Sequence, residues 1–105
     1  MNSAIELIAA ERQRQIDVEG FDADHDDREN GLGLLPDAAA AYTRVAGAQA
    51  RGATADEFPA DMMVCEGDWP WDEKWWKPSG NPIRNLVKAG ALIVAEIERL
   101  QRLKP

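Results

Sequence analysis

Residues 81–103 constrain the fold more than any other part of this chain. Asn81 is a favourable N-cap and Pro82 suits the first helical position. Apolar side chains then recur at helical spacing; they are Ile83, Leu86, Val87, Leu92, Ile93, Val94, Ile97 and Leu100. This wide stripe predicts a helix over residues 82–103 whose middle is covered on most sides. Because glycine costs about 1 kcal/mol relative to alanine inside a helix, Gly90 predicts a close neighbour there.

Two more helices are predicted upstream. Ser3 and Glu6 form a capping box that starts a helix over residues 3–18. A second helix, over residues 34–51, is indicated by a seam with 3-4-3-4 spacing; its members are Leu32, Leu35, Ala39, Tyr42 and Ala46. This seam would pack inside the chain or pair two copies in a homo-oligomer.

The segments between these helices lack a sustained apolar period. Residues 19–31 are predicted to be an acidic loop with room for one helical turn. Residues 53–81, rich in proline and tryptophan, are predicted to be a second loop, in which Thr54 and Glu57 would cap a short helical turn before Pro59. The predicted fold class is therefore all-α: a single domain over residues 1–105, a small bundle of three main helices with the tryptophan-rich loop packed over the core. We expect at least two of the four tryptophans in the core, and an exposed one to anchor a ligand or partner.

Composition limits the partners and the compartment. The net charge of −7 disfavours direct contact with a nucleic-acid backbone. The single cysteine, Cys65, excludes a disulfide framework and a cysteine-based zinc site. The longest unbroken apolar run, residues 89–95, is too short to span a membrane, and no signal-peptide core is present. These features predict a cytoplasmic protein.

Carboxylates gather around the one histidine, His25. Seven acidic residues lie within 17–29, namely Asp17, Glu19, Asp22, Asp24, Asp26, Asp27 and Glu29. We consider a partner- or ligand-binding surface made of part of this cluster and the tryptophan segment; its candidates are Asp22, Asp24, Trp69, Trp71, Trp75, Trp76 and Lys77. The alternative is a solvated acidic loop with one residue capping the next helix.

A metal site is a second hypothesis for the cluster. The alternation of Asp22, Asp24 and Asp26 resembles a calcium loop, but Asp27 stands where that loop needs glycine and Gly33 where it needs glutamate. A looser Mg²⁺ or Mn²⁺ site would use four candidate ligands: Glu11, His25, Asp26 and Asp27.

Catalytic signatures are few. The chain has no HExxH motif, Walker A loop, dinucleotide fingerprint or serine nucleophile elbow. All-α nucleotide pyrophosphohydrolases hold magnesium with carboxylates one helical turn apart on facing helices. Here Glu6 and Glu11 are five residues apart, and Glu96 and Glu98 point to different sides. The carboxylates are present without that spacing.

Several sequence blocks together resemble a family of small proteins common in phage and prophage genomes. The blocks are ERQRQ at 11–15, GF and DHDD within 20–27, AAAAY at 38–42, WPW at 69–71, WWKP at 75–78 and LVKAGALIVAEIERL at 86–100. The resemblance implies a phage or prophage origin and an accessory role, and it supplies no catalytic residues. The chain departs from the family with GLGLLPD where relatives carry Gly-Glu-Leu or Gly-Gln-Leu.

The preferred functional hypothesis is a phage-derived accessory protein that acts by binding, with counter-defence as one such role. Its target would be a host protein or a small nucleotide-like ligand. The alternative is a divalent-metal-dependent hydrolase, similar to a nucleotide pyrophosphohydrolase or acting on another phosphoester. A third hypothesis is nucleic-acid mimicry by the carboxylates.

Overall fold

The computed structural model describes residues 2–103, so the ends of the predicted 1–105 domain lie outside it. The all-α class is confirmed, with five α-helices and two short 3-10 helices in the described chain. They are α1 (Ala4–Glu19), α2 (Ala23–Glu29), α3 (Leu34–Ala50), η1 (Ala55–Glu57), α4 (Ala60–Cys65), η2 (Glu73–Trp75) and α5 (Pro82–Arg102). None of these helices is long and apolar enough to cross a membrane.

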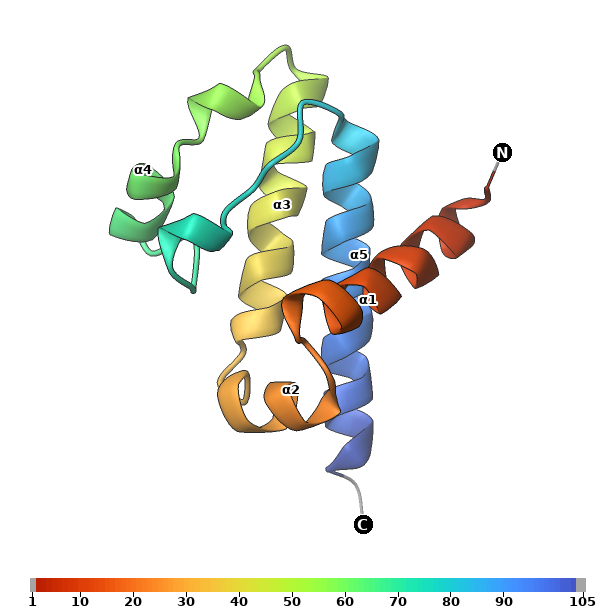
Figure 1. The fold of residues 1–105 in the computed structure, drawn as a ribbon. Helices are drawn as coiled ribbons and strands as arrows, with labels where there is room; N and C mark the ends of the chain where they lie inside the picture. The colour runs from red at the N-terminus through yellow and green to blue at the C-terminus, as the bar shows by residue number, and fades with distance from the viewer. Residues whose placement is uncertain (1, 104–105) are drawn as a thin grey trace.

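Helices α3 and α5 run antiparallel side by side and form the centre of the molecule (Figure 1). Small side chains let the two backbones approach closely; Ala38, Ala39, Ala91 and Ala95 are all buried. Larger buried residues such as Leu35, Val45 and Leu92 fill the remaining space. The predicted bundle is thus built around one helix pair, and the other elements are placed against it.

Helix α1 crosses α5 (Figure 1), and Gly90 of α5 lies against Ile8 of α1. A Cβ atom added to Gly90 would lie 2.8 Å from Cδ1 of Ile8 on α1. The predicted close neighbour of this glycine is therefore Ile8. The missing side chain sets how near α1 lies to α5.

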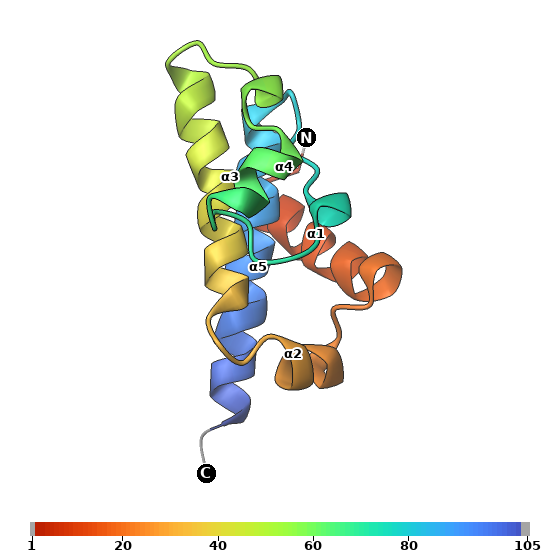
Figure 2. The same ribbon diagram turned by 90° about the vertical axis from the view of Figure 1, so that its left-hand side faces the viewer.

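The tryptophan-bearing segment lies across the α3–α5 pair (Figure 2). Trp69 and Trp76 are buried, and their indole N–H groups donate to the carbonyl oxygens of Asp72, at 3.1 Å, and Phe58, at 2.8 Å. Trp71 is half-buried, whereas Trp75 is 42% exposed. At least two tryptophans are in the core, as predicted.

Two segments predicted to be loops contain helices. Within residues 19–31 the structure has α2, whose N-cap Asp22 accepts a hydrogen bond from the His25 backbone N–H at 2.9 Å. Within residues 53–81, η1 is the short turn that Thr54 and Glu57 were expected to cap, whereas α4 and η2 were not predicted. The prediction missed α2 because polar tertiary pairing, described below, replaces the apolar stripe that normally indicates a helix.

The seam on α3 packs inside the chain. Leu35, Ala39, Tyr42 and Ala46 are buried, while Leu32, counted in the predicted seam, lies before α3 and is 90% exposed. The seam is therefore not free to pair two copies. Helix α5 carries five of the exposed apolar side chains of the described residues, so its predicted stripe is not covered on most sides; the five are Ile83, Leu86, Ile93, Ile97 and Leu100.

Candidate functional site

Asp26 serves as an internal anchor. Its carboxylate is fully buried and accepts hydrogen bonds from Nη2 of Arg12, at 3.4 Å, and Nδ2 of Asn30, at 3.0 Å. Arg12 also donates to Glu98 of α5 at 3.1 Å and to the carbonyl oxygen of Phe21 at 2.8 Å. Arg12 thus joins α1, α2 and α5, and Asp26 balances its charge.

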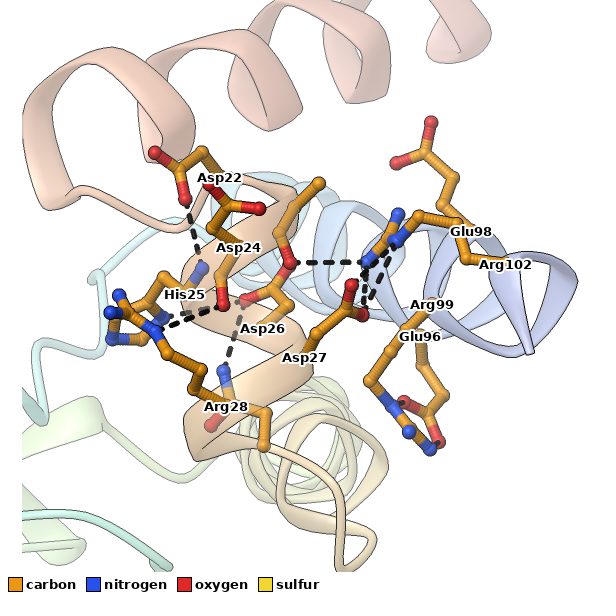
Figure 3. A network of polar contacts seen from close by, with 12 residues as sticks. Asp22, Asp24, His25, Asp26, Asp27, Arg28, Glu96, Glu98, Arg99 and Arg102 are labelled. Atoms are coloured by element: carbon orange, nitrogen blue, oxygen red, sulfur yellow. Dashed lines mark hydrogen bonds and ion pairs between the residues drawn. The ribbon is translucent and has the colours of Figure 1, made fainter.

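The next carboxylate, Asp27, is also paired. Arg102 of α5 donates to it from Nη2 at 2.9 Å, and this hydrogen bond lowers the pKa of Asp27 (Figure 3). Asp22 is occupied as the cap of α2, and Asp24 is exposed. Much of the predicted acidic cluster is therefore engaged by groups of the chain itself.

Glu11 lies between two arginines. Its buried carboxylate accepts hydrogen bonds from Arg14, at 2.8 Å to each oxygen, from Arg84 of α5, and from Nε2 of Gln15 at 3.2 Å. Burial alone would raise the pKa of Glu11, but the hydrogen bonds from Arg14 and Arg84 outweigh it and lower the pKa.

The four predicted metal ligands do not converge. Only His25 and Asp26 are close, with Nδ1 and Oδ1 3.6 Å apart. Glu11 and Asp27 belong to separate ion pairs with Arg84 and Arg102. In residues 2–103 no group of three or more His, Cys, Asp or Glu side chains is placed to hold a metal ion. The arginines account for the difference from the prediction, because each neutralises a carboxylate that a metal would need.

A different site lies where α1, α5 and the tryptophan segment meet. We call this cavity of about 210 Å³ the indole pocket. It is lined by Glu11, Arg14, Gln15, Glu19, Phe21, Tyr42, Trp69, Trp71, Trp75, Lys77, Arg84, Lys88 and Leu92. Its aromatic side chains pack edge to face or tilted, with Trp69 5.2 Å from Trp71 and 5.5 Å from Tyr42 between ring centroids.

The charge of the indole pocket is opposite to that of the whole protein. Four lining residues are cationic and two are anionic; the cations are Arg14, Lys77, Arg84 and Lys88, the anions Glu11 and Glu19. Ion pairs join Glu11 to Arg14 and Arg84, and Glu19 to Arg14. Within the described chain neither lysine has a carboxylate within ion-pair distance. The pocket thus has surplus positive charge in a protein of net charge −7.

Lys88 carries that surplus in a partly buried place. Its Nζ donates to the carbonyl oxygen of Lys77 at 2.6 Å and lies 5.4 Å from the centre of the Tyr42 ring. Burial, and then the charge of Arg84, lower the pKa of Lys88. An anion beside Lys88 would oppose both effects, because a nearby negative charge favours the charged amine.

A second cavity, of about 350 Å³, adjoins the first. We call it the acidic pocket; it is lined by Glu19, Phe21, His25, Glu29, Asn30, Leu34, Trp71, Asp72 and Trp75. Four residues line both cavities: Glu19, Phe21, Trp71 and Trp75. Phe21 stacks on His25, with centroids 5.2 Å apart, and contacts Trp71 at 5.3 Å. An aromatic array therefore runs from the core to α2 along both pockets.

Buried polar atoms without a partner gather at these cavities. In the described chain the side-chain atoms of this kind are Oε1 of Gln15, Nδ1 of His25 and Oδ1 of Asn30. Gln15 lines the indole pocket, and His25 and Asn30 line the acidic pocket. A buried polar group without a hydrogen bond costs about 1–3 kcal/mol, so each needs an explanation. A ligand that supplies the missing partners is one.

The structure divides the predicted binding residues. Trp69, Trp71, Trp75 and Lys77 line the indole pocket, whereas Trp76, Asp22 and Asp24 line neither cavity. Residues missed by the sequence prediction include Arg14, Gln15, Arg84 and Lys88 on the helices and Asn30 after α2. The sequence did contain a signal for two of these residues, because Arg84 and Lys88 are four residues apart and therefore place two positive charges on one face of the predicted last helix.

Comparison with known proteins adds no assignment. No protein-family model matches the chain, and neither a curated protein nor a solved structure is similar enough to count as a match.

Proposed function

We propose that this protein binds a small nucleotide-like ligand in the indole pocket and acts by binding rather than by turnover. The observation that carries the proposal is the surplus of cations over carboxylates beside an indole wall, in a protein that is otherwise acidic. Such a pocket selects an anion with a flat aromatic body. Nucleotides combine these two features.

The aromatic wall provides the surface for a base. Trp75 is exposed and Trp71 half-buried, so both offer indole area to a ligand. Stacking of a nucleobase on an aromatic side chain contributes about 1–3 kcal/mol and is tolerant of base identity. Lys74 and Lys77 lie 5.4 Å and 5.8 Å from the centre of the Trp75 ring, which helps to hold this indole in place.

The lysines provide the counter-charge for a phosphate. Lys88 is partly desolvated and has no carboxylate partner in the described chain, so its charge is incompletely compensated without a ligand. A phosphate beside Lys88, Lys77 and Arg84 would form charge-assisted hydrogen bonds in a half-enclosed place, where they are stronger than in water.

Capture of a small ligand agrees with the accessory role that the phage-like sequence blocks imply, and counter-defence would be one such role. It is favoured over docking of a host protein on the acidic segment, because Asp26 and Asp27 are engaged within the chain and Asp22 caps α2. Among residues 2–103 the pocket has no assembled metal ligands, so no hydrolytic step is part of the proposal.

A fluorescence titration tests the proposal, because three tryptophans line the pocket. Adenosine 5′-monophosphate (AMP) should change the tryptophan emission in a saturable way. Adenosine without phosphate and inorganic phosphate without base should each bind at least about tenfold more weakly, since each keeps only half of the interactions. Absence of a saturable change with AMP and with the other common nucleoside monophosphates would refute the proposal.

A further inference from the structure

We infer that the acidic pocket receives the hydrogen-bond-donating edge of an amino-bearing nucleobase, while the phosphate of the same ligand lies in the indole pocket. This inference rests on the proposed function and adds a ligand class to it: nucleotides of adenine, guanine or cytosine. The two pockets have opposite chemistry and share one aromatic wall.

The orientation of two buried amides shows which hydrogen-bonding groups remain unused. Nδ2 of Asn30 donates to Oδ1 of Asp26, and Nε2 of Gln15 donates to Oε2 of Glu11. A carboxylate only accepts, so each amide must point its nitrogen at the acid and leave its oxygen free. The free groups, Oδ1 of Asn30 and Oε1 of Gln15, are acceptors. A donating group in the acidic pocket would satisfy Oδ1 of Asn30, whereas Gln15 lines the indole pocket alone and does not bear on the base edge.

The charges of the acidic pocket point the same way. Among the described residues its lining contains three carboxylates and no lysine or arginine; the carboxylates are Glu19, Glu29 and Asp72. Glu19 is partly compensated by Arg14, at 3.1 Å, whereas Glu29 forms no ion pair in the described chain. Carboxylates accept hydrogen bonds from amino groups and repel phosphates. The acidic pocket therefore excludes the phosphate end of a nucleotide and favours a donor-rich end.

The shared wall connects the two ends. Phe21, Trp71 and Trp75 line both cavities, so a base lying on these rings reaches the acidic pocket with its edge while its phosphate stays near Lys88. Asn30 is fully buried, so only a group that enters past the outer side chains meets it. The ligand can therefore bind in one orientation only, with its base edge in the acidic pocket and its phosphate in the indole pocket.

Two matched nucleotide pairs test the inference. AMP differs from purine riboside 5′-monophosphate by the 6-amino group alone, and guanosine monophosphate differs from inosine monophosphate by the 2-amino group. In at least one pair the amino-bearing nucleotide should bind about tenfold more tightly, the size expected for a hydrogen bond to a charged or buried acceptor. Equal affinities within both pairs would overturn the inference and leave the phosphate site intact.

Variants locate the effect. Asn30→Leu should abolish the preference, so that the two nucleotides of a pair bind with about equal affinity. Glu29→Gln, at an exposed residue of the acidic pocket alone, should reduce it partly without affecting folding. Lys88→Met should weaken both members of a pair equally. A preference that survives Glu29→Gln and a folded Asn30→Leu variant unchanged would place amino recognition elsewhere. If no nucleotide binds at all, the proposed function itself fails.

Discussion

Glu11 of α1 accepts a hydrogen bond from Arg84 of α5, 73 residues further along the chain. The carboxylate that the sequence presented as a metal ligand therefore joins two helices beside the indole pocket. Arg14 binds the same carboxylate from within α1. Positioning of the pocket's cations thus depends on a buried acid.

Replacing Glu11 with glutamine should destabilise the protein by about 1–2 kcal/mol at neutral pH, since the two arginines that lose a charged partner remain half-exposed. Folding lowers the pKa of Glu11, so its contribution is present above the ordinary value of 4.5 and is lost as the pH falls through the lower folded value. Urea unfolding across that range should show a shallower acid dependence for Glu11→Gln than for the wild type. An equal pH dependence of the unfolding free energy in Glu11→Gln and the wild type would contradict this contribution of Glu11.

Asp26 and Asp27 are adjacent in the sequence but differ in burial, so replacing each with alanine compares the stability contributed by a buried and an exposed ion pair. Asp26→Ala should cost about 1–3 kcal/mol, because it removes a fully buried acceptor from Arg12 and Asn30, although Arg12 keeps its ion pair with Glu98. Asp27→Ala should cost less than about 1 kcal/mol, because its pair with Arg102 is exposed to solvent. Thermal unfolding followed by circular dichroism measures both. Similar losses for the two variants would show that the anchor role of Asp26 is wrong.

Magnesium or manganese should leave the melting temperature unchanged. The reason is that Glu11, Asp26 and Asp27 are each engaged by an arginine and do not meet at one point. Differential scanning fluorimetry with millimolar metal, and with EDTA as the control, checks this. A metal-dependent rise that Asp26→Asn abolishes would restore the metal-site hypothesis.

Gly90→Ala should destabilise the protein by about 1 kcal/mol, although alanine is the better helix former. The added methyl would lie 2.8 Å from Cδ1 and 3.1 Å from Cγ1 of Ile8. An overpacking cost of about 1–3 kcal/mol therefore equals or exceeds the gain of about 1 kcal/mol in helix propensity. Ile8→Val removes the nearer atom, so the double variant should be more stable than the sum of the single effects. Simple additivity would argue against a close crossing of α1 and α5 at this point.

Sequence periodicity predicted the long helices α1, α3 and α5, but not which face of α5 is buried, because five residues of its predicted stripe are exposed; they are Ile83, Leu86, Ile93, Ile97 and Leu100. The last helix and the α3 seam follow helical spacing, and the position of Gly90 within its helix was enough to indicate a close neighbour. Helix α2 was missed because its stability depends on Asp22 as a cap and on Asp26 paired with Arg12, which lies in another helix. A spacing rule contains no information on such a partner.

The candidate site was predicted only in part for the same reason. Trp71, Trp75 and Lys77 stand in one short segment and were recognisable together. Glu11 and Arg84 meet only through the crossing of α1 over α5, and Asn30 reaches the acidic pocket only because α2 forms. Ion pairs with arginines also change the role of the acidic cluster. Carboxylates that the sequence suggested as cation ligands instead connect helices within the protein.

The most direct test of the central claim is the combined effect of Lys88→Met on stability and on AMP binding. Folding lowers the pKa of Lys88, so the folded protein without ligand is destabilised by the positive charge of this side chain at neutral pH. The variant should melt at an equal or slightly higher temperature without ligand and bind AMP at least about tenfold more weakly. Lys74→Met is the control, because Lys74 also lies near Trp75 but does not line the pocket, and it should keep wild-type affinity. Wild-type affinity for AMP in Lys88→Met would contradict the account.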